Sequence, residues 1–285
     1  MNVLIIILNY NGIEILKKNL SSVVKNDYPT FDILLVDNNS TDNSIKYVKE
    51  TYPNVMILKN DANLGFGKAN NIAVSKYPNY DAYLFLNNDM YVEKKFLTHL
   101  VKVLEKDNEI GAVGPKILYY KKKDDKYIIN SAGIKVTKHY MAYDRYEGEI
   151  DNDKINVAEE VDALTGGALL VRKEAYNKVN GFNDKMFFYY EDVDLSLRLR
   201  DNGYKLYYCG KSVVYHDHMG TAKKMFSSTK RNILSMKNRF ITIKERENTF
   251  KAIELTSWYL YNWLLWKIFY GKKLTLKDYL SKKDD

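Results

Sequence analysis

The 285-residue chain has one cysteine, four prolines and no long apolar run. The one cysteine, Cys209, excludes a framework of internal disulfides and suits a reducing compartment. No segment approaches the roughly 20 consecutive apolar residues that a membrane-spanning helix needs. Internal repeats are absent, and no linker rich in Pro or Ser divides the chain into separate globular parts. Because 46% of its residues are hydrophobic, the chain can still bury a sizeable core.

Two common phosphate-binding motifs are also missing. The sequence contains no Walker lysine motif, and its one Gly-x-Gly segment is Gly65-Phe66-Gly67. That segment lacks the third glycine of the dinucleotide-binding motif, and it does not follow the first predicted strand. The sequence therefore disfavours a Rossmann dehydrogenase and a P-loop enzyme.

Excess positive charge is absent from most of the chain and is concentrated near its C-terminal end. The net charge is +8, yet residues 1–219 carry 29 Lys and Arg against 30 Asp and Glu. Residues 220–285 carry 15 against 6, together with all three tryptophans. A basic nucleic-acid-binding protein is one interpretation, but no nucleic-acid motif accompanies this charge. We therefore expect no nucleic-acid partner.

The basic segment has the pattern of two helices. Residues 221–250 place apolar side chains at intervals near seven among many Lys and Arg, and residues 253–270 are rich in Trp and Tyr. Aromatic rings beside lysines suit a membrane interface with anionic headgroups. We therefore expect a cytoplasmic protein, peripheral on the cytoplasmic face of the membrane through residues 221–285. A helix docked on the body, or buried in a homodimer, is the alternative.

Short apolar runs alternate with helical stretches through the first part of the chain, which predicts an open α/β sheet. The predicted helices are residues 14–25, a helix capped by Ser40 or Thr41, and residues 64–77. In open α/β sheets, ligands bind outside the carboxyl ends of the strands. The predicted strands are residues 3–8, 33–36, 55–58 and 82–86, with later strands at 161–172, 206–209 and 213–215.

Eight short motifs follow one another along the chain. They are Asn9-Tyr10-Asn11, residues 36–42, residues 63–67 with Asn70-Asn71, residues 86–89, Gly166-Gly167-Ala168, Gly181-Phe182-Asn183, residues 187–194 and His216. In this set and order, which covers about residues 2–220, the chain resembles the family 2 glycosyltransferases. The Asp-Asn after the second strand and the Asn-x-Asp after the fourth look most like rhamnosyltransferase-type members.

The resemblance implies the GT-A fold, an α/β architecture with a mixed, mostly parallel central sheet flanked by helices. Residues 1–220 would form the GT-A domain, with a nucleotide-binding half at 1–118 and an acceptor half at 119–220. Residues 221–285 would form a basic, aromatic-rich helical extension. The implied activity is inverting transfer of a sugar from a UDP- or dTDP-sugar, with dTDP-rhamnose as one candidate. A glycan or lipid-linked glycan of a cell-surface polysaccharide would be the acceptor.

Metal binding and base catalysis are expected at two carboxylate motifs. The resemblance makes Asp89 the last residue of an Asp-x-Asp metal motif, in which Asn87 replaces the first aspartate, and His216 would complete a site for Mn²⁺ or Mg²⁺. Asp192 would be the general base, with Glu191 as an acceptor contact. Because three carboxylates lie within residues 191–194, repulsion should raise at least one pKa. An acidic turn that complements a helix dipole is the alternative interpretation.

Donor binding is expected at polar strand ends and at a glycine pair. Gly166 and Gly167 would let backbone N–H groups approach the donor sugar, although a packing bulge explains the same glycines. Turn formation is the alternative for the polar residues, and a non-catalytic sugar-nucleotide-binding or glycan-binding module with this fold is a rival function. The residues expected to bind the nucleotide are Asn9, Asp37, Asn38, Asn70, Asn71 and Asn88.

Overall fold

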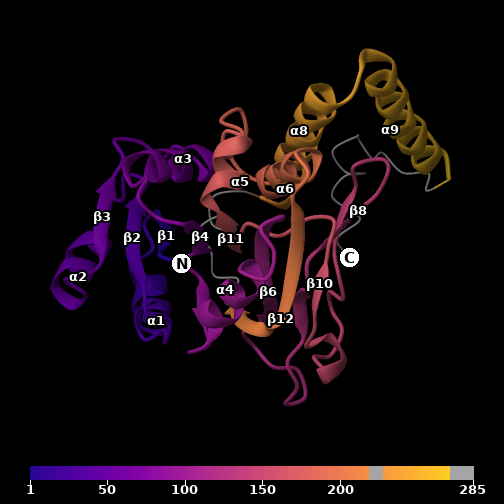
Figure 1. Ribbon diagram of the computed structural model, residues 1–285. Coiled ribbons are helices and arrows are strands. Elements are labelled where there is room, and N and C mark those ends of the chain that lie inside the picture. The colour runs from indigo at the N-terminus through magenta and orange to yellow at the C-terminus, as the bar shows by residue number, and fades with distance from the viewer. Residues whose placement is uncertain (218–226, 270–285) are drawn as a thin grey trace.

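The computed structural model describes residues 1–217 and 227–269. The basic, aromatic-rich extension expected at residues 221–285 falls outside the described residues at 221–226 and 270–285. The described chain forms one ten-stranded sheet with helices on both faces, a small two-stranded sheet, and two C-terminal helices (Figure 1). This is the α/β architecture that the alternating pattern predicted.

The sheet is mixed, as the resemblance implied. Its order is β10-β12-β6-β11-β4-β1-β2-β3, while β5 pairs with β12 and β7 pairs with β6. Pairing is parallel from β3 through β2 and β1 to β4, and between β6 and β12, whereas β11 runs antiparallel between β4 and β6. The strands are β1 Val3–Asn9, β2 Phe31–Asp37, β3 Met56–Lys59, β4 Ala82–Asn87, β5 Met90–Val92, β6 Ile110–Tyr119, β7 Ile129–Ser131, β10 Ala158–Glu160, β11 Ala168–Arg172 and β12 Lys205–His216.

Helices cover the sheet on both sides, and the small sheet lies beside it. Figure 1 shows α3, α5 and α6 on one face and α1 and α4 on the other. The small sheet is the antiparallel hairpin β8–β9, made of Ile134–Val136 and Ala142–Asp144. The helices are α1 Ile13–Val24, α2 Ser44–Thr51, α3 Phe66–Lys76, α4 Phe96–Leu104, α5 Lys173–Lys178, α6 Glu191–Asp201, α8 Ser228–Arg246 and α9 Thr249–Phe269, with a 3-10 turn at Asp153–Ile155.

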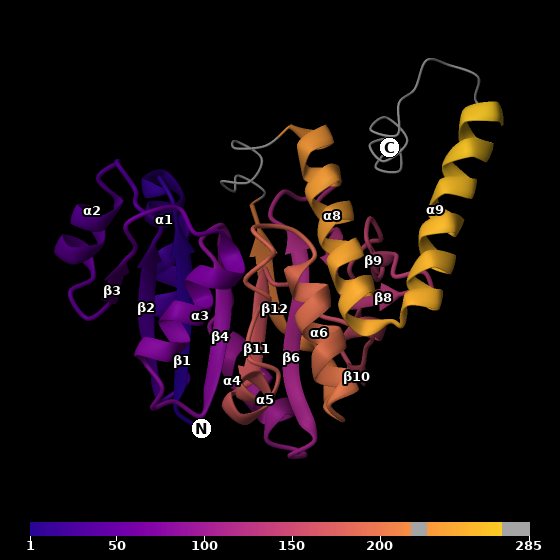
Figure 2. The same ribbon diagram turned by 90° about the horizontal axis from the view of Figure 1, so that it is seen from above.

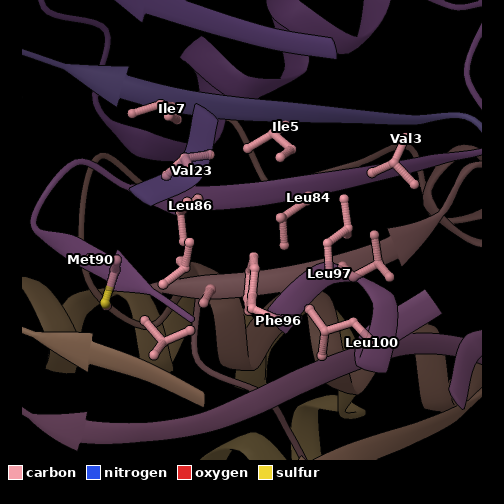
Figure 3. Close-up of a cluster of buried hydrophobic side chains, with 14 of the residues drawn as sticks. Val3, Ile5, Ile7, Val23, Leu84, Leu86, Met90, Phe96, Leu97 and Leu100 are labelled. Atoms are coloured by element: carbon pink, nitrogen blue, oxygen red, sulfur yellow. The ribbon is translucent and has the colours of Figure 1, made fainter. Parts of the chain in front are cut away.

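Alternation along β1 explains the two helix layers. Ile5 and Ile7 point with Leu84 of β4 into the cluster under α1 and α4 (Figure 3). Leu4 and Ile6 point the other way and join side chains of α3, α5 and α6. Each fully buried aliphatic side chain contributes roughly 1.5–3 kcal/mol. The continuous apolar run at the start of the chain is therefore a strand buried on both faces.

Three local predictions need correction. Helix α2 begins at Ser44 after Asn43, and not at a cap by Ser40 or Thr41, because the Ser40 hydroxyl is hydrogen bonded to Asp37 instead. The run at residues 161–172 forms a strand only from Ala168 onward. The two late strands are one strand, β12, with a register shift between Cys209 and Val213. Cys209 itself is buried in that strand.

The described part of the C-terminal extension, residues 227–269, forms two helices that dock on the body. Figure 2 shows α8 beside α6, and α9 begins near the β8–β9 hairpin and then runs away from it. Ile243 of α8 and Leu255 of α9 are each 1% exposed, in a cluster with Tyr190 and Val193. Among the described residues, no helix is both long enough and apolar enough to cross a membrane.

Candidate active site

A cavity of about 420 Å³ lies where the start of α6, the β8–β9 hairpin and the ends of β4 and β12 meet. The segment before β11 and the start of α3 also contribute to its wall. Aromatic side chains at positions 66 and 188–190 line one part of it, and carboxylates line another. The predicted site residues that line it are Asn87, Gly166, Gly167, Glu191, Asp192 and His216.

Asp192 is fixed by the backbone at the start of α6. Its Oδ2 accepts a hydrogen bond from the Gly166 N–H at 2.7 Å, and its Oδ1 accepts one from the Val193 N–H at 2.8 Å. A Cβ on Gly166 would lie 3.2 Å from the Asp192 Cβ, so glycine allows this close approach. The N–H of Gly166 thus contacts the carboxylate, while the Gly167 carbonyl accepts the Asn87 N–H.

Glu191 differs from Asp192 in its hydrogen bonding. It is 6% exposed, and its Oε2 has no hydrogen-bond partner among the described residues. Burial, with added repulsion from Asp192, raises the pKa of Glu191 to about 8. Burial also raises the pKa of Asp192, but its two backbone N–H donors oppose that shift. These backbone N–H groups favour the charged form of Asp192, whereas Glu191 Oε2 has no such donor among the described residues.

The loop before this pair has an unusual backbone that α8 supports. Tyr189 and Tyr190 have φ values of 70° and 73°, in the left-handed region that costs a non-glycine residue about 1 kcal/mol or more. The Asn238 side chain of α8 donates to the carbonyls of Phe188 at 3.0 Å and Tyr189 at 2.6 Å. Tyr190 donates from its hydroxyl to the Tyr140 carbonyl. Contacts from two distant segments thus hold the loop that presents Asp192.

Asp89 and His216 form a pair at the end of β4. His216 Nε2 lies 3.3 Å from Asp89 Oδ2, and His216 Nδ1 lies 2.8 Å from Asn130 Oδ1. The carboxylate is buried, and the imidazole lines the cavity together with Asn87. Within residues 1–217 and 227–269, no group of three or more His, Cys, Asp and Glu side chains is placed to hold a metal ion. A divalent cation bound here would need further ligands from a substrate or water.

The polar ends of three neighbouring strands form one buried network. Asn9 donates to Asp37 at 3.1 Å and accepts from Asn88 at 3.2 Å. The strand register explains why these two side chains are adjacent, because Asn9 pairs with Asp37 across β1 and β2. Asn9 and Asp37 are fully buried, and the hydroxyl of Ser40 also donates to Asp37. The network fixes the loop that follows β2.

The other predicted nucleotide contacts lie on α3 and beside it. Asn38 donates to the Gly65 carbonyl at 3.1 Å, and Asn70 donates to the Phe66 carbonyl at 3.0 Å. Asn71 donates to the Phe182 carbonyl at 2.8 Å and accepts from the Phe182 N–H at 2.9 Å. These amides join α3 to the segments that precede α2 and α6. None of the three lines the cavity, so the structure does not bring them together with Asp192.

The sequence analysis missed one wall of the cavity. Tyr143 and Asp144 of β9, Glu147 after it, and Asn130 of β7 all line the cavity. Burial, with repulsion from Glu147 and Asp192, raises the pKa of Asp144 to about 7. No motif marks this segment, which is charged, rich in tyrosine and only weakly periodic.

Comparison with known proteins gives a family and several relatives. The family described as "Glycosyl transferase family 2" matches residues 4–179, which is more than half of the chain. A second family, described as "N-terminal domain of galactosyltransferase", matches residues 148–221.

Two rhamnosyltransferases are among the similar proteins. The chain is 28% identical over 201 residues to an N-acetylglucosaminyl-diphospho-decaprenol L-rhamnosyltransferase of Mycobacterium tuberculosis, covering 65% of this chain and 66% of that protein. It is also 28% identical over 246 residues to the rhamnosyltransferase WbbL of Escherichia coli, covering 79% of this chain and 88% of that protein. The match therefore spans just under two thirds of the mycobacterial relative's length.

Solved structures share the fold at low sequence identity. GalNAc-T7 with UDP, GalNAc and Mn²⁺ matches with a TM-score of 0.67 and 16% identity, covering 85% of this chain and 48% of that one. The mannosyltransferase PcManGT from Pyrobaculum calidifontis, in complex with GDP-Man and Mn²⁺, matches with a TM-score of 0.56 and 16% identity, covering 98% and 84%. At these identities the likeness shows the fold alone.

Proposed function

Because this chain belongs to glycosyl transferase family 2 and has the GT-A fold, we propose that it is an inverting, metal-dependent glycosyltransferase. The observation that carries this proposal is the Asp192 carboxylate, which accepts hydrogen bonds from two backbone N–H groups and lies in the cavity wall beside the buried Glu191. A carboxylate of this kind suits a general base.

The proposed step is a displacement at the anomeric carbon of the donor sugar. Asp192 takes the proton of an acceptor hydroxyl, whose oxygen forms the new bond to the anomeric carbon. The bond from that carbon to the diphosphate oxygen breaks, and the nucleoside diphosphate leaves with the electron pair. Glu191, which keeps its proton at neutral pH, presents a donor to a substrate oxygen in the cavity. Attack from the face opposite the leaving group inverts the configuration.

Asp89 and His216 fit a divalent cation, with Asn87 as a neutral oxygen donor nearby. The Asp89 carboxylate, completed by substrate phosphate oxygens, provides the oxygen ligands that Mg²⁺ and Mn²⁺ prefer, and the His216 imidazole is a ligand that Mn²⁺ accepts more readily than Mg²⁺. A bound Mn²⁺ or Mg²⁺ would neutralise charge on the leaving diphosphate. Two of the solved structures that share the fold contain Mn²⁺, which supports this proposal.

The nucleotide is proposed to bind at the strand ends formed by Asn9, Asp37, Asn38 and Asn88, beside α3. The Asp37 carboxylate is fully buried and already accepts hydrogen bonds from Asn9 and Ser40, so contact with a uracil or thymine would require it to exchange one of these bonds. Asn70 and Asn71 would act mainly by holding α3 in place. Gly166 and Gly167 would leave room for the donor sugar next to Asp192.

For the donor substrate we propose a UDP- or dTDP-sugar, with dTDP-rhamnose as the first candidate. Two similar proteins are named rhamnosyltransferases, and the mycobacterial one is named for a lipid diphosphate-linked N-acetylglucosamine acceptor. These names support a glycan or lipid-linked glycan acceptor in cell-surface polysaccharide synthesis.

A screen of nucleotide sugars tests the function and the metal together. We expect one UDP- or dTDP-sugar to raise the melting temperature in the presence of Mn²⁺ and to be slowly hydrolysed. A ligand at 100 times its Kd stabilises a protein by about 2.7 kcal/mol. Replacing Asp89 by alanine should remove the Mn²⁺-dependent part of the shift, because one anionic ligand is lost. Melting curves and release of the nucleoside diphosphate are the measurements.

The control is Glu50→Ala, which removes an exposed carboxylate from α2 and should leave both readouts unchanged. Binding without any donor consumption, even with acceptors present, would favour the rival sugar-nucleotide-binding module. An unchanged Mn²⁺ response in the Asp89 variant would contradict the metal assignment.

We further propose that α9 binds a membrane surface. Phe250, Ile253, Leu260 and Tyr261 are exposed and lie within one stripe of about 100° at 100° per residue. Leu255, which packs on the body, lies on the opposite side of the helix. The excess of Lys and Arg over residues 220–285 complements anionic lipids. An apolar stripe with a basic surround is typical of helices that lie in the interface.

Replacing Ile253 by glutamate should weaken binding to vesicles of phosphatidylglycerol and phosphatidylcholine at least tenfold in co-sedimentation. The reason is that a buried aliphatic side chain contributes roughly 1.5–3 kcal/mol, and the new charge is repelled by the lipid. Ile150→Glu is the matched control, since Ile150 is 48% exposed on the body against 61% for Ile253. The stripe is instead a subunit interface if the wild-type protein does not bind vesicles and if Ile253→Glu dissociates a dimer in analytical sedimentation.

A further inference from the structure

The hairpin side of the cavity carries two carboxylates that the proposed step does not use. Asp144 ends β9, and Glu147 follows it in the next turn. Asp144 lies near enough to Asp192 for the two negative charges to interact. Glu147 accepts a hydrogen bond from the Tyr119 hydroxyl at 3.0 Å. With the pair on α6, the cavity wall therefore holds four carboxyl groups.

The cavity lining has a chemistry that suits neutral, hydroxyl-rich groups. The described residues that line it include neither Lys nor Arg, and His216 is the one basic side chain among them. Carboxylates accept hydrogen bonds from sugar hydroxyls, and they repel anions in a region of low dielectric. The aromatic ring of Tyr143, which is 47% exposed, lies in the same wall. Aromatic faces beside carboxylates suit a pyranose ring.

An unpartnered oxygen shows independently that the cavity is built for a ligand. Glu191 is 94% buried and lines the cavity, yet its Oε2 has no hydrogen-bond partner in the described chain. A buried polar group without a partner costs roughly 1–3 kcal/mol. A hydroxyl group entering the cavity would satisfy this oxygen and would recover that cost.

The hairpin is anchored firmly enough to act as a binding wall. Ile134 and Ala163 exchange two backbone hydrogen bonds of 2.8 and 3.1 Å. The Arg145 guanidinium donates to the Ala132 carbonyl and to Glu159. Because Asp144 precedes Arg145, its backbone is fixed on both sides. Its carboxylate lies in the wall of the same cavity as Asp192.

We propose that the β8–β9 hairpin forms the acceptor subsite, in which Asp144 binds a hydroxyl of an uncharged acceptor sugar. This inference rests on the proposed transferase function. Asp144 and Glu191 approach the acceptor from two sides of the cavity, which leaves the reacting hydroxyl facing Asp192. The surrounding negative charge excludes acceptors that carry a carboxylate on the reacting sugar.

The test uses the full chain with the nucleotide sugar that the donor screen selects, and octyl glycosides as acceptor probes. The neutral probes are the β-glucoside, galactoside, mannoside and N-acetylglucosaminide, and octyl β-glucuronide is the charged counterpart of the first. We expect at least one neutral glycoside to accelerate donor consumption and the glucuronide to fail. Asp144→Asn should raise the acceptor KM about tenfold or more, with a much smaller change in donor KM.

Asp125→Asn, in the exposed turn after β6, is the matched control and should change neither parameter. An unchanged acceptor KM in the Asp144 variant, or equal use of glucoside and glucuronide, would overturn the subsite. Acceleration by none of the neutral glycosides would overturn it as well. Failure of the wild-type protein to consume any donor would instead overturn the proposed function, so the two failures are distinguishable.

Discussion

Replacing Asp192 by asparagine should lower kcat for sugar transfer by about 10²- to 10⁴-fold, the usual contribution of a general base. Asparagine keeps the shape of the side chain, and its amide oxygen can still accept the Gly166 N–H. The variant loses the negative charge and the proton acceptor, but not the cavity. Donor affinity, measured by titration with the nucleotide sugar and Mn²⁺, should therefore change little.

The pH profile gives a sharper form of this prediction. Burial raises the pKa of Asp192, so wild-type kcat should fall as the pH is lowered through that raised value. Asp192→Asn should lose this acidic limb together with most of the activity. Retention of wild-type kcat, or of the acidic limb at reduced kcat, would show that another group is the base.

The neighbouring glutamate gives a separate prediction, for stability as a function of pH. The pKa of Glu191 rises from 4.5 to about 8 on folding, so the folded state holds this proton more tightly. Its contribution to stability is present below pH 4.5 and is lost as the pH rises through about 8. In Glu191→Gln this loss is removed, and the variant should gain stability over wild type between pH 5 and pH 9 in urea unfolding.

Replacing Asn238 by leucine should have the second large effect, although this residue lies outside the cavity. The side chain is 1% exposed and donates to two loop carbonyls. Leucine fills a similar volume but leaves both carbonyls without their partner, which costs roughly 1–3 kcal/mol each. The left-handed turn at Tyr189 and Tyr190 then loses its support. A displacement of Asp192 by about 1 Å can lower kcat about 100-fold.

The measurements must separate positioning from general loss of stability. We expect kcat to fall about 10- to 100-fold in Asn238→Leu with donor KM nearly unchanged. Leu20→Ala, in the cluster under α1 on the other face of the sheet, should lose a comparable 2–5 kcal/mol of stability with kcat preserved. If Asn238→Leu and Leu20→Ala have equal kcat when folded, Asn238 has only a structural role.

Much of the fold could be predicted because local signals and tertiary structure agree. The strand at residues 3–8 is apolar throughout and is buried on both faces, and the polar residues that follow β1, β2 and β4 do meet at one edge. Parallel pairing brings these strand ends together whatever the lengths of the connections. The antiparallel insertion of β11 between β4 and β6 has no local signal, because strand order depends on contacts distant in sequence.

The candidate site was predictable only where a motif marks it. Asp192 and Asp89 stand in recognisable motifs, whereas Asp144 lies in a segment without periodicity, and Asn238 lies in a helix whose charge pattern indicated a separate tail. The pattern of α8 showed an amphipathic helix but not the surface on which it docks. That surface is formed by Tyr190 and Val193, which become neighbours of Ile243 only when the chain folds.

The solitary thiol of Cys209 has a practical consequence. It is buried in β12, its Sγ faces the His99 carbonyl, and burial raises its pKa, so little reactive thiolate forms near neutral pH. A maleimide reagent should therefore not react with Cys209 in the folded protein. One cysteine introduced at Phe250 and a second at Tyr143 would then carry a pair of spectroscopic labels. Their separation would report whether α9 moves relative to the hairpin when vesicles are added.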